Sequence, residues 1–369
     1  MRKTKMKIRE VIDFLDSIAP LQTQESYDNS GLLAGDASDN CDSVLLCLDV
    51  TEDVVDEAIK SKTGLIISHH PFIFGGLKKV TGKNAGERIL IKVIRHGISV
   101  YCLHTPFDLS FSGINIALAR LLGLKNIRIL KPAEAGLKKI VTFVPESHAS
   151  QVRKAMFDAD AGHIGNYDSC SFNINGQGTF RAMDSAKPFV GKKGELHTEK
   201  EVRVETIVPF YRVDKVIAAM KKVHPYEEVA YDIYPIENVN HLTGIGAIGE
   251  TSGKISERNF LLSVRKKLGI KLIKHSAFKG KDVARVAVCG GSGSFLISDA
   301  IKAGADIFVT GDVKYHQFQE AENRIVIADA GHYETEKVFL PLMNELLNKK
   351  FTNFAVRISK TNTNPVNYL

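Results

Sequence analysis

Strand-like and helix-like segments alternate through the first and last thirds of the sequence, and this alternation constrains the fold more than any other feature. Short apolar runs typical of buried strands are separated by amphipathic segments with helical spacing. In the first third, the expected strands and helices alternate over residues 43–50, 51–60, 65–67, 85–96, 98–103 and 114–122. In the last third they alternate over residues 283–289, 296–303, 306–310, 325–328 and 333–348. Strands separated by helices predict an α/β domain with a mainly parallel sheet covered by helices.

The middle of the chain follows a different order, β-α-β-β-α-β. Strands are expected over residues 140–144, 202–208 and 229–233, and helices over 149–159 and 213–223. Residues 171–174 and 178–181 are expected to pair as a hairpin across Asn175-Gly176, a dipeptide that favours tight turns. This order is that of a ferredoxin-like α+β domain. The sequence therefore predicts a discontinuous α/β domain, residues 1–137 and 238–369, interrupted by an inserted domain, residues 138–237.

Composition excludes several classes of protein. A hydrophobic content of 44% and a charged content of 25% are ordinary for a soluble globular chain. The 5 cysteines are odd in number and form no CxxC pair, so we expect a reducing compartment. No signal peptide and no apolar run long enough to span a membrane is present, so we expect a cytoplasmic protein without a membrane partner. The net charge of +7 could attract nucleic acid, but the basic residues are scattered and this partner is not favoured.

Two adjacent histidines, His69 and His70, directly follow the expected strand over residues 65–67. Imidazole is a common ligand for zinc, iron, nickel and copper. Because the chain turns where a strand ends, two neighbouring histidines there can address two metal ions or one shared cavity. The alternative, a pair of histidines that hydrogen-bond to the backbone, stays open for this motif alone.

His104 and Asp108 follow the next expected strand, over residues 98–103. Pro106 between them disfavours a regular helix, so we expect both side chains to project from one loop. Asp108 is a hard oxygen ligand and could bridge two metal ions, or it could cap the following helix. His104 is either a ligand or a residue that orients one.

His332 and Glu336 follow the expected strand over residues 325–328 and begin a helical segment. Their i, i+4 spacing places both side chains on one helix face, at the positive end of the helix dipole. A group of capping acidic residues is the alternative interpretation. Glu334 points elsewhere and is not chosen.

The three motifs, taken together, predict one metal site at the carboxyl edge of the sheet. In an open α/β sheet, ligands collect beyond the carboxyl ends of the strands, and all three motifs fall at such ends. The set supplies nitrogen and oxygen ligands and no thiolate, which suits a two-metal hydrolytic site better than a structural zinc site. The predicted metal ligands are His69, His70, Asp108, His332 and Glu336.

Four other segments carry weaker signals. The glycine-rich segment 290–293 could cradle phosphate or form a tight turn for packing. Asp312 and His316 follow another strand and could reach the site as acid/base or orienting groups. The segment 27–31 is an ordinary turn or a loop at the mouth of the site, and the segment 224–228 is a structural turn or a binding element.

Taken together, these motifs resemble the Nif-three-like family, which includes the GTP cyclohydrolase I type 2 homologues. The resemblance covers almost the whole chain and rests on Tyr27–Gly31, Ser68–Pro71, His104–Asp108, Thr310–Asp312, Gly331-His332 with Glu336, and Asn364–Val366. Residues 165–172 and 224–228 resemble the PII-like domain inserted in longer bacterial members. The resemblance implies a dinuclear metal site with the five ligands named above, and a toroidal homohexamer whose sites face an internal cavity.

Three functions are compatible with these observations. The first is a metal-dependent hydrolase that acts on a nucleotide-like or phosphorylated small molecule, with two divalent ions per subunit (zinc, iron or manganese). Its nucleophile would be a water, and His104 or His316 would move the proton as a catalytic residue. The second is a regulatory or metal-handling protein without catalysis, and the third is association with nucleic acid. Metal-dependent turnover, ligand binding without turnover, and steep salt dependence would distinguish them.

Overall fold

The computed structural model describes residues 6–133 and 136–369, which form two compact units. The first unit joins the two ends of the chain, residues 1–132 and 241–369, and the second comprises residues 133–240. Within the described residues, no helix combines the length and the apolar character needed to cross a membrane.

The first unit contains a five-stranded sheet of order β17-β4-β5-β6-β2. Its strands are β17 (Ala355–Ile358), β4 (Ser43–Cys47), β5 (Leu65–Ser68), β6 (Ser99–Cys102) and β2 (Gly31–Ala34). The first four strands of that order run parallel, and β2 pairs antiparallel with β6. The helices around this sheet are α1 (Ile8–Ile18), α2 (Glu52–Lys60), α3 (Ala85–Arg95) and α12 (Phe339–Lys350).

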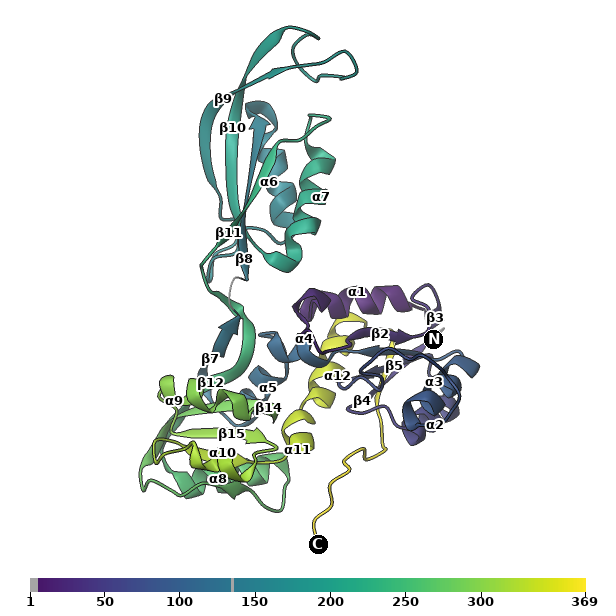
Figure 1. The fold of residues 1–369 in the computed structure, drawn as a ribbon, viewed down its shortest axis with the longest axis vertical. Coiled ribbons are helices and arrows are strands. Elements are labelled where there is room, and N and C mark those ends of the chain that lie inside the picture. Colours follow the sequence, from purple (N-terminus) through teal and green to yellow (C-terminus); the bar gives the residue numbers. More distant parts are fainter. Residues whose placement is uncertain (1–5, 134–135) are drawn as a thin grey trace. The chain divides into compact units, whose positions relative to one another are not determined.

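Alternation of side chains along the strands gives this sheet two buried faces. Leu45 and Ile66 pack in one core cluster with apolar residues of α2 and α3, which lie side by side in Figure 1. Leu46 and Ile67 point to the opposite face, where they share a cluster with α1 and α12. Strands buried on both faces explain the continuous apolar runs in the sequence. A short pair, β1 (Met6–Lys7) and β3 (Asn40–Cys41), and the turn η1 (Leu21–Thr23) complete this part.

A second, six-stranded sheet in the same unit has the order β13-β16-β15-β14-β12-β7. Its strands are β13 (Lys274–His275), β16 (Val326–Asp329), β15 (Ile307–Gly311), β14 (Asp282–Ser292), β12 (Asn240–Ser256) and β7 (Lys125–Ala133). The central strands β16, β15 and β14 are parallel, whereas β13 and β12 pair antiparallel with them. The associated helical elements are α8 (Glu257–Leu268), η4 (Ser294–Leu296), α9 (Ile297–Lys302) and α10 (Tyr315–Gln319).

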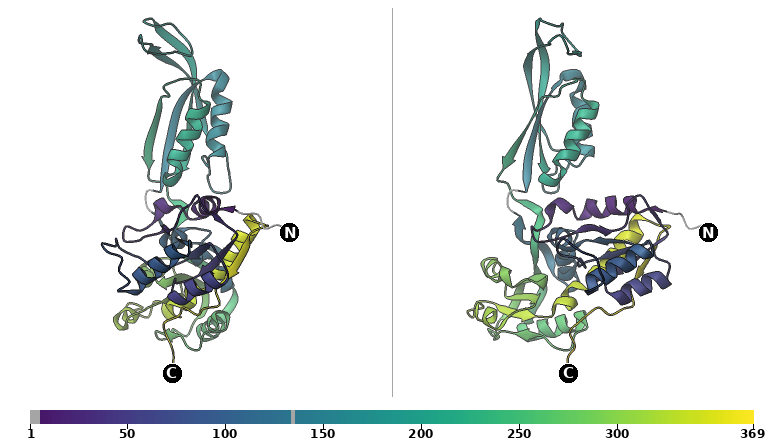
Figure 2. Two further views of the ribbon diagram at one scale, coloured as in Figure 1. Left: turned by 90° about the vertical axis from the view of Figure 1, so that its right-hand side faces the viewer. Right: turned by 45° about the vertical axis from the view of Figure 1, so that its right-hand side comes forward.

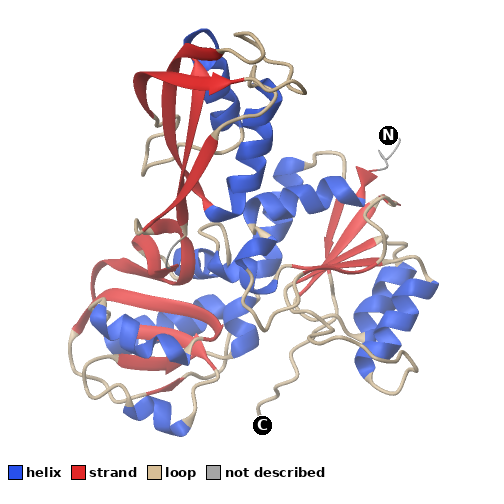
Figure 3. Cartoon of the chain, turned by 45° about the horizontal axis from the view of Figure 1, so that its top comes forward, coloured by secondary structure: helices blue, strands red, loops and turns tan. Residues whose placement is uncertain are grey.

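The two halves of the discontinuous unit exchange their edge strands. β7 precedes the insertion but belongs to the six-stranded sheet, and β17 follows it but belongs to the five-stranded sheet. Three helices, α4 (His104–Leu109), α5 (Ile114–Leu121) and α11 (His332–Glu336), pack near the junction. One core cluster includes residues of both sheets, and Figure 3 shows the two sheets with helices between them. The expected mainly parallel sheet is therefore two mixed sheets that share a core.

The second unit is a four-stranded antiparallel sheet with two helices. Its elements are β8 (Leu137–Pro145), η2 (Glu146–His148), α6 (Ala149–Asp158), β9 (Phe172–Arg181), β10 (Leu196–Pro209), η3 (Phe210–Arg212), α7 (Val213–Val223) and β11 (Tyr231–Ile236). The sheet order is β11-β8-β10-β9, and α6 and α7 cover one face of it, as Figure 2 shows. This is the expected β-α-β-β-α-β order.

Two local expectations were wrong. Residues 171–174 and 178–181 do not form a hairpin, because β9 is continuous and pairs with β10 through Asn175 and Gly176. The long partner strand supplies a ladder that overrides the turn preference of Asn-Gly. The single helix expected over residues 333–348 is two helices, α11 and α12, separated by a turn at Lys337 and Val338.

Candidate metal centre

The strand β5 places His69 and His70 at its carboxyl end. Backbone hydrogen bonds continue past the strand, from His69 N to Cys47 O (3.3 Å) and from His70 N to Leu48 O (2.9 Å). Ser68 donates its hydroxyl to the carbonyl of His70 at 2.9 Å. The chain at this strand end is therefore held firmly enough to direct two consecutive imidazoles.

The helix α4 carries His104 and Asp108, so the expectation of a loop was wrong. Pro106 is the third residue of this short helix. The backbone N–H groups of a first helical turn have no partner within the helix, so proline costs little there. The four-residue spacing then places His104 and Asp108 on one helix face.

The helix α11 carries His332 and Glu336, and it is seated against glycines of the six-stranded sheet. A side chain at Gly291 would meet Glu336 Oε1 at 2.2 Å, and one at Gly311 would meet the backbone of His332 at 2.7 Å. The Gly291 N–H group is engaged, since it donates to Thr335 Oγ1 at 2.9 Å. The N–H groups of Gly290 and Gly293 are engaged as well, by Asn115 Oδ1 and Thr310 Oγ1, so in this structure the glycine-rich segment serves as a packing surface for α11.

Three imidazole nitrogens converge on the carboxylate of Glu336. His69 Nε2 lies 3.5 Å from Glu336 Oε1. His70 Nε2 and His332 Nε2 lie 3.0 Å and 3.1 Å from Glu336 Oε2. The fifth predicted ligand, Asp108, approaches from α4, with Oδ1 at 3.7 Å from His69 Nε2. The structure thus brings together all five residues predicted as metal ligands.

The donor atoms of His69, His70 and Glu336 lie within 4.8 Å of one another and could hold a metal ion. His69 is fully buried, and both of its ring nitrogens lack a hydrogen-bond partner among the described residues. An unpaired buried polar group is costly, and coordination of a cation removes that cost. A set of imidazole and carboxylate donors without thiolate suits a divalent ion, and these residues therefore fit one.

Three of the four histidines around this centre are held by a carboxylate on Nδ1, which directs Nε2 the other way. The pairs are His70 with Asp49 (2.8 Å), His104 with Asp28 (2.8 Å) and His332 with Asp312 (2.6 Å). A carboxylate on the far nitrogen is the usual support of a metal-ligating histidine, because it fixes the tautomer and raises the basicity of the ligand.

Burial and neighbouring charges shift the pKa values in the centre in opposite directions. Burial, together with the carboxylate of Glu336, raises the pKa of Asp108 to about 8. Although burial alone would lower them, the nearby carboxylates raise the pKa of His70 to about 10 and that of His332 to about 9. The surrounding histidines outweigh burial and hold the pKa of Glu336 well below its usual value. The centre thus favours positive charge beside Glu336, as a cation-binding site does.

His104 lies beside the cluster and contacts the two consecutive histidines. Its ring centroid is 5.5 Å from that of His69 and 5.4 Å from that of His70. Its partner Asp28 also accepts hydrogen bonds from Thr105 and Ser30, and these bonds with His104 keep the pKa of Asp28 below its usual value despite burial. The segment 27–31 is therefore part of the centre and not an ordinary turn.

His316 is not brought to the centre by any contact among the described residues. It lies on α10, where its ring packs edge-on against Tyr315 at 5.2 Å. Asp312, four residues earlier in the chain, does contact the centre through His332. Asp49 was missed in the sequence analysis, although it follows β4 and the strand-end rule could have identified it.

In the comparisons with known proteins, one family model and full-length relatives match nearly the whole chain. Residues 6–365 match the family model Duf34/NIF3 (NGG1p interacting factor 3). The chain belongs to the DUF34/NIF3 family. It is 38% identical over 365 residues to the "GTP cyclohydrolase 1 type 2 homolog" of Halalkalibacterium halodurans, with 97% of this chain and 98% of the relative covered. A relative of the same name from Bacillus subtilis is 38% identical over 371 residues, with 98% of each chain covered.

A solved structure of the DUF34/NIF3 family is similar throughout. The crystal structure of a Bacillus cereus protein related to NIF3 superposes with a TM-score of 0.86 at 38% identity, and the match covers 100% of both chains. The family resemblance drawn from the sequence motifs is therefore confirmed. The names of the relatives describe homology to a cyclohydrolase, and the activity of this chain has to be argued from its own site.

Proposed function

We propose that the protein is a metal-dependent hydrolase with a dinuclear centre, acting on a nucleotide-like or phosphorylated small molecule. The observation that carries this proposal is the convergence of three histidine Nε2 atoms on the buried carboxylate of Glu336, within 3.5 Å. His69, which is fully buried with neither ring nitrogen hydrogen-bonded among the described residues, is costly to bury without a cation.

The two oxygens of Glu336 support two ion positions. Oε1 faces His69, which also lies near Asp108, whereas Oε2 faces His70 and His332. We therefore assign His69 and Asp108 to one divalent ion and His70 and His332 to a second, with Glu336 shared between them. Zinc, iron and manganese all accept these donors.

The ions would supply Lewis acidity toward a carbonyl or phosphoryl oxygen and would lower the pKa of a water toward neutrality. The chain's own contribution is the transfer and placement of protons. His104 is fixed by Asp28 through Nδ1, which leaves Nε2 as the nitrogen that can accept or donate a proton. Asp28 is held as an anion by the hydrogen bonds it accepts, so it stays an acceptor for the His104 ring and fixes its orientation.

A nucleotide-like substrate is supported by an exposed aromatic ring next to His104. Phe74 is 59% exposed, and its ring centroid lies 6.1 Å from that of His104. A large exposed aromatic side chain beside a group of titratable residues offers a stacking surface for a heterocyclic base. A purine nucleotide, as in the cyclohydrolase of the relatives' name, is one substrate that would use it.

Two further features of the proposal concern assembly. We propose that the protein is a homohexamer, on the basis of its family resemblance, and that residues 138–237 form a PII-like inserted domain. The β-α-β-β-α-β order of the second unit supports the latter. The expected cytoplasmic location is part of the same proposal.

The test is a turnover screen with defined metal content. Purified protein is assayed with a panel of nucleotides and phosphoesters, as isolated, after chelation, and after reloading with zinc, iron or manganese. We expect turnover that disappears on chelation and returns with metal. His104→Ala should keep its metal and lose about 10²-fold or more in rate, the usual contribution of a general acid or base. His96→Ala, at an exposed histidine that ends α3, is the matched control and should behave as the unmodified protein.

Two results would contradict the proposal. Turnover that survives complete metal removal would show that the centre does not drive the reaction. A covalent intermediate trapped on the protein would show that a side chain and not a water is the nucleophile. Ligand binding without any turnover would instead favour the regulatory alternative.

A further inference from the structure

The second unit contains a pocket on the sheet face that α6 and α7 leave open. Its volume is about 560 Å³, which lies within the usual range for small-molecule sites. Val202 and Val204 of β10 point into the core beneath the helices, so the intervening residues Glu201 and Arg203 point to the opposite face and line the pocket. All of its lining residues belong to this unit, and none of them is a residue of the metal centre.

Two glycines of β9 form the floor of the pocket. A side chain at Gly178 would meet Glu201 Oε2 at 2.1 Å, so the carboxylate of Glu201 occupies the space above this position. Among the described residues, no heavy atom lies within 4 Å of the position that a side chain at Gly176 would take. Gly176 therefore opens the pocket, and a bulky residue there would fill it without displacing the strand.

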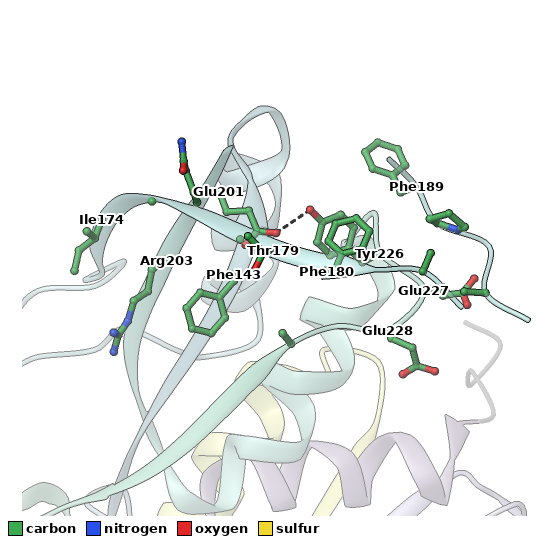
Figure 4. Close-up of a pocket in the computed structure, with 17 residues that line it drawn as sticks. Phe143, Ile174, Thr179, Phe180, Phe189, Glu201, Arg203, Tyr226, Glu227 and Glu228 are labelled. Carbon is green, nitrogen blue, oxygen red and sulfur yellow. Dashed lines mark hydrogen bonds between the residues drawn. The ribbon is translucent and has the colours of Figure 1, made fainter. Parts of the chain in front are cut away.

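Aromatic rings gather at the end of the pocket near Glu201, as Figure 4 shows. Tyr226 lies between Phe180 and Phe189, with ring centroids 6.1 Å and 6.4 Å away. The Tyr226 hydroxyl donates to Glu201 Oε1 at 2.8 Å, which fixes the carboxylate beside the rings. Phe189 is 51% exposed, so its ring is accessible to a ligand in the pocket.

The charges of the lining are mostly negative. Glu201, Glu227 and Glu228 line the pocket, and Arg203 is the only basic residue among its lining residues. Arg203 is paired with Glu205, at 2.9 Å between Nη2 and Oε1, although its Nε is buried without a hydrogen-bond partner among the described residues. An anionic ligand would face three carboxylates, whereas a cation would be attracted by them and by the faces of the rings.

We propose that this pocket binds a small organic cation, with an ammonium group held by Glu201 and the rings of Phe180, Phe189 and Tyr226. Aromatic faces beside a carboxylate are the recurring means by which proteins recognise ammonium groups. The apolar part of the ligand extends over Gly176 toward Phe143 and Ile174, which line the far end. The segment 224–228 is thus a binding element as well as a turn.

The test is titration calorimetry of the full-length protein with three probes: choline, its uncharged isostere 3,3-dimethylbutan-1-ol, and AMP as an anionic heterocycle. We expect choline to bind at least about tenfold more tightly than the isostere, and AMP not to bind in this unit. Glu201→Gln should weaken choline binding about tenfold and Gly176→Leu should abolish it. Glu146→Gln, at an exposed carboxylate of the same unit outside the lining, is the control and should have no effect.

Several outcomes would overturn the proposal. These are no choline binding, equal binding of choline and its isostere, AMP binding that Gly176→Leu abolishes, and choline binding unaffected by Glu201→Gln. If both pocket variants change the oligomeric mass without changing choline binding, the face is an interface between copies of the chain. Thermal melts establish whether each variant is folded. If Gly176→Leu does not fold, Glu201→Gln still tests the proposal.

Discussion

Replacing Asp49 by asparagine should weaken metal binding without removing a ligand. Asp49 Oδ1 lies 2.8 Å from His70 Nδ1, and its other oxygen accepts a hydrogen bond from Thr363 in the C-terminal segment. The substitution keeps the size of the side chain but removes the charge that makes His70 a more basic ligand. Thr363 also hydrogen-bonds this side chain, so the new amide is not free to turn toward His70. We therefore expect the asparagine to hold the ring of His70 less firmly in its orientation.

The size of the expected loss in metal affinity follows from the kind of contact and from its burial. Loss of a carboxylate behind a ligating histidine typically costs 10- to 100-fold in metal affinity, or about 1.4–2.8 kcal/mol. The side chain of Asp49 is 36% exposed, whereas that of Asp312, the equivalent partner of His332, is 54% exposed. Because solvent screens the more exposed pair, Asp49→Asn should have the larger effect, and Asp312→Asn should lie near the lower end of that range.

The assay is a competition titration of the metal-free protein against a chromophoric chelator with zinc or manganese. Asp56→Asn is the matched control, since Asp56 forms an ion pair with Lys92 on the surface of α2 and α3. This control should leave the affinity unchanged. Metal binding by Asp49→Asn as tight as that of the unmodified protein, or a larger effect of Asp312→Asn, would refute this role of Asp49.

Three further predictions concern the core packing, the inserted domain and the assembly. Phe339→Ala should reduce the free energy of unfolding in urea by about 3–5 kcal/mol, because Phe339 is fully buried and contacts the rings of His69 and Phe107. An unchanged midpoint of the urea transition would contradict this packing. Replacement of residues 138–237 by a short Gly/Ser linker should leave a soluble protein that melts cooperatively and binds metal, whereas a protein that never folds would contradict the insertion. Light scattering should give the mass of a hexamer, and a monomer mass at all concentrations would exclude it.

Much of the fold could be predicted because each buried element has a strong local pattern. Glu52–Lys60 has an N-cap at Thr51 and a regular apolar face, and Val213–Val223 has the same bounds in sequence and structure. The continuous apolar strands Ser43–Cys47 and Leu65–Ser68 were likewise recognisable. These features depend on neighbouring residues alone, and the sequence contains them.

The remaining features depend on contacts between distant segments. The exchange of β7 and β17 between the two sheets is set by the pairing of strands far apart in the chain, which no local pattern encodes. The Asn175-Gly176 dipeptide favours a turn locally, but the ladder with β10 decides its conformation. Pro106 was misjudged because its effect depends on its place within a short helix.

The candidate site shows the same division between local and distant information. The strand-end rule located His69, Asp108 and Glu336, because the residue types and their positions in the sheet order are both visible in the sequence. It did not reveal that Asp28 and Asp49 stand behind two of the histidines, since these carboxylates are separated from them by 76 and 21 residues. Partners at such distances become visible only when the chain is folded.

In the proposed centre, residues from three strand ends hold divalent metal ions. The most direct measurement is the metal content of the purified protein by elemental analysis, with the variants His69→Ala, Asp108→Ala and Glu336→Ala. We expect divalent metal in the unmodified protein and a clear loss in each variant, with Glu336→Ala losing most because both positions share it, while thermal melts show that the fold is retained. Full metal occupancy in all three variants would contradict the assignment of the centre.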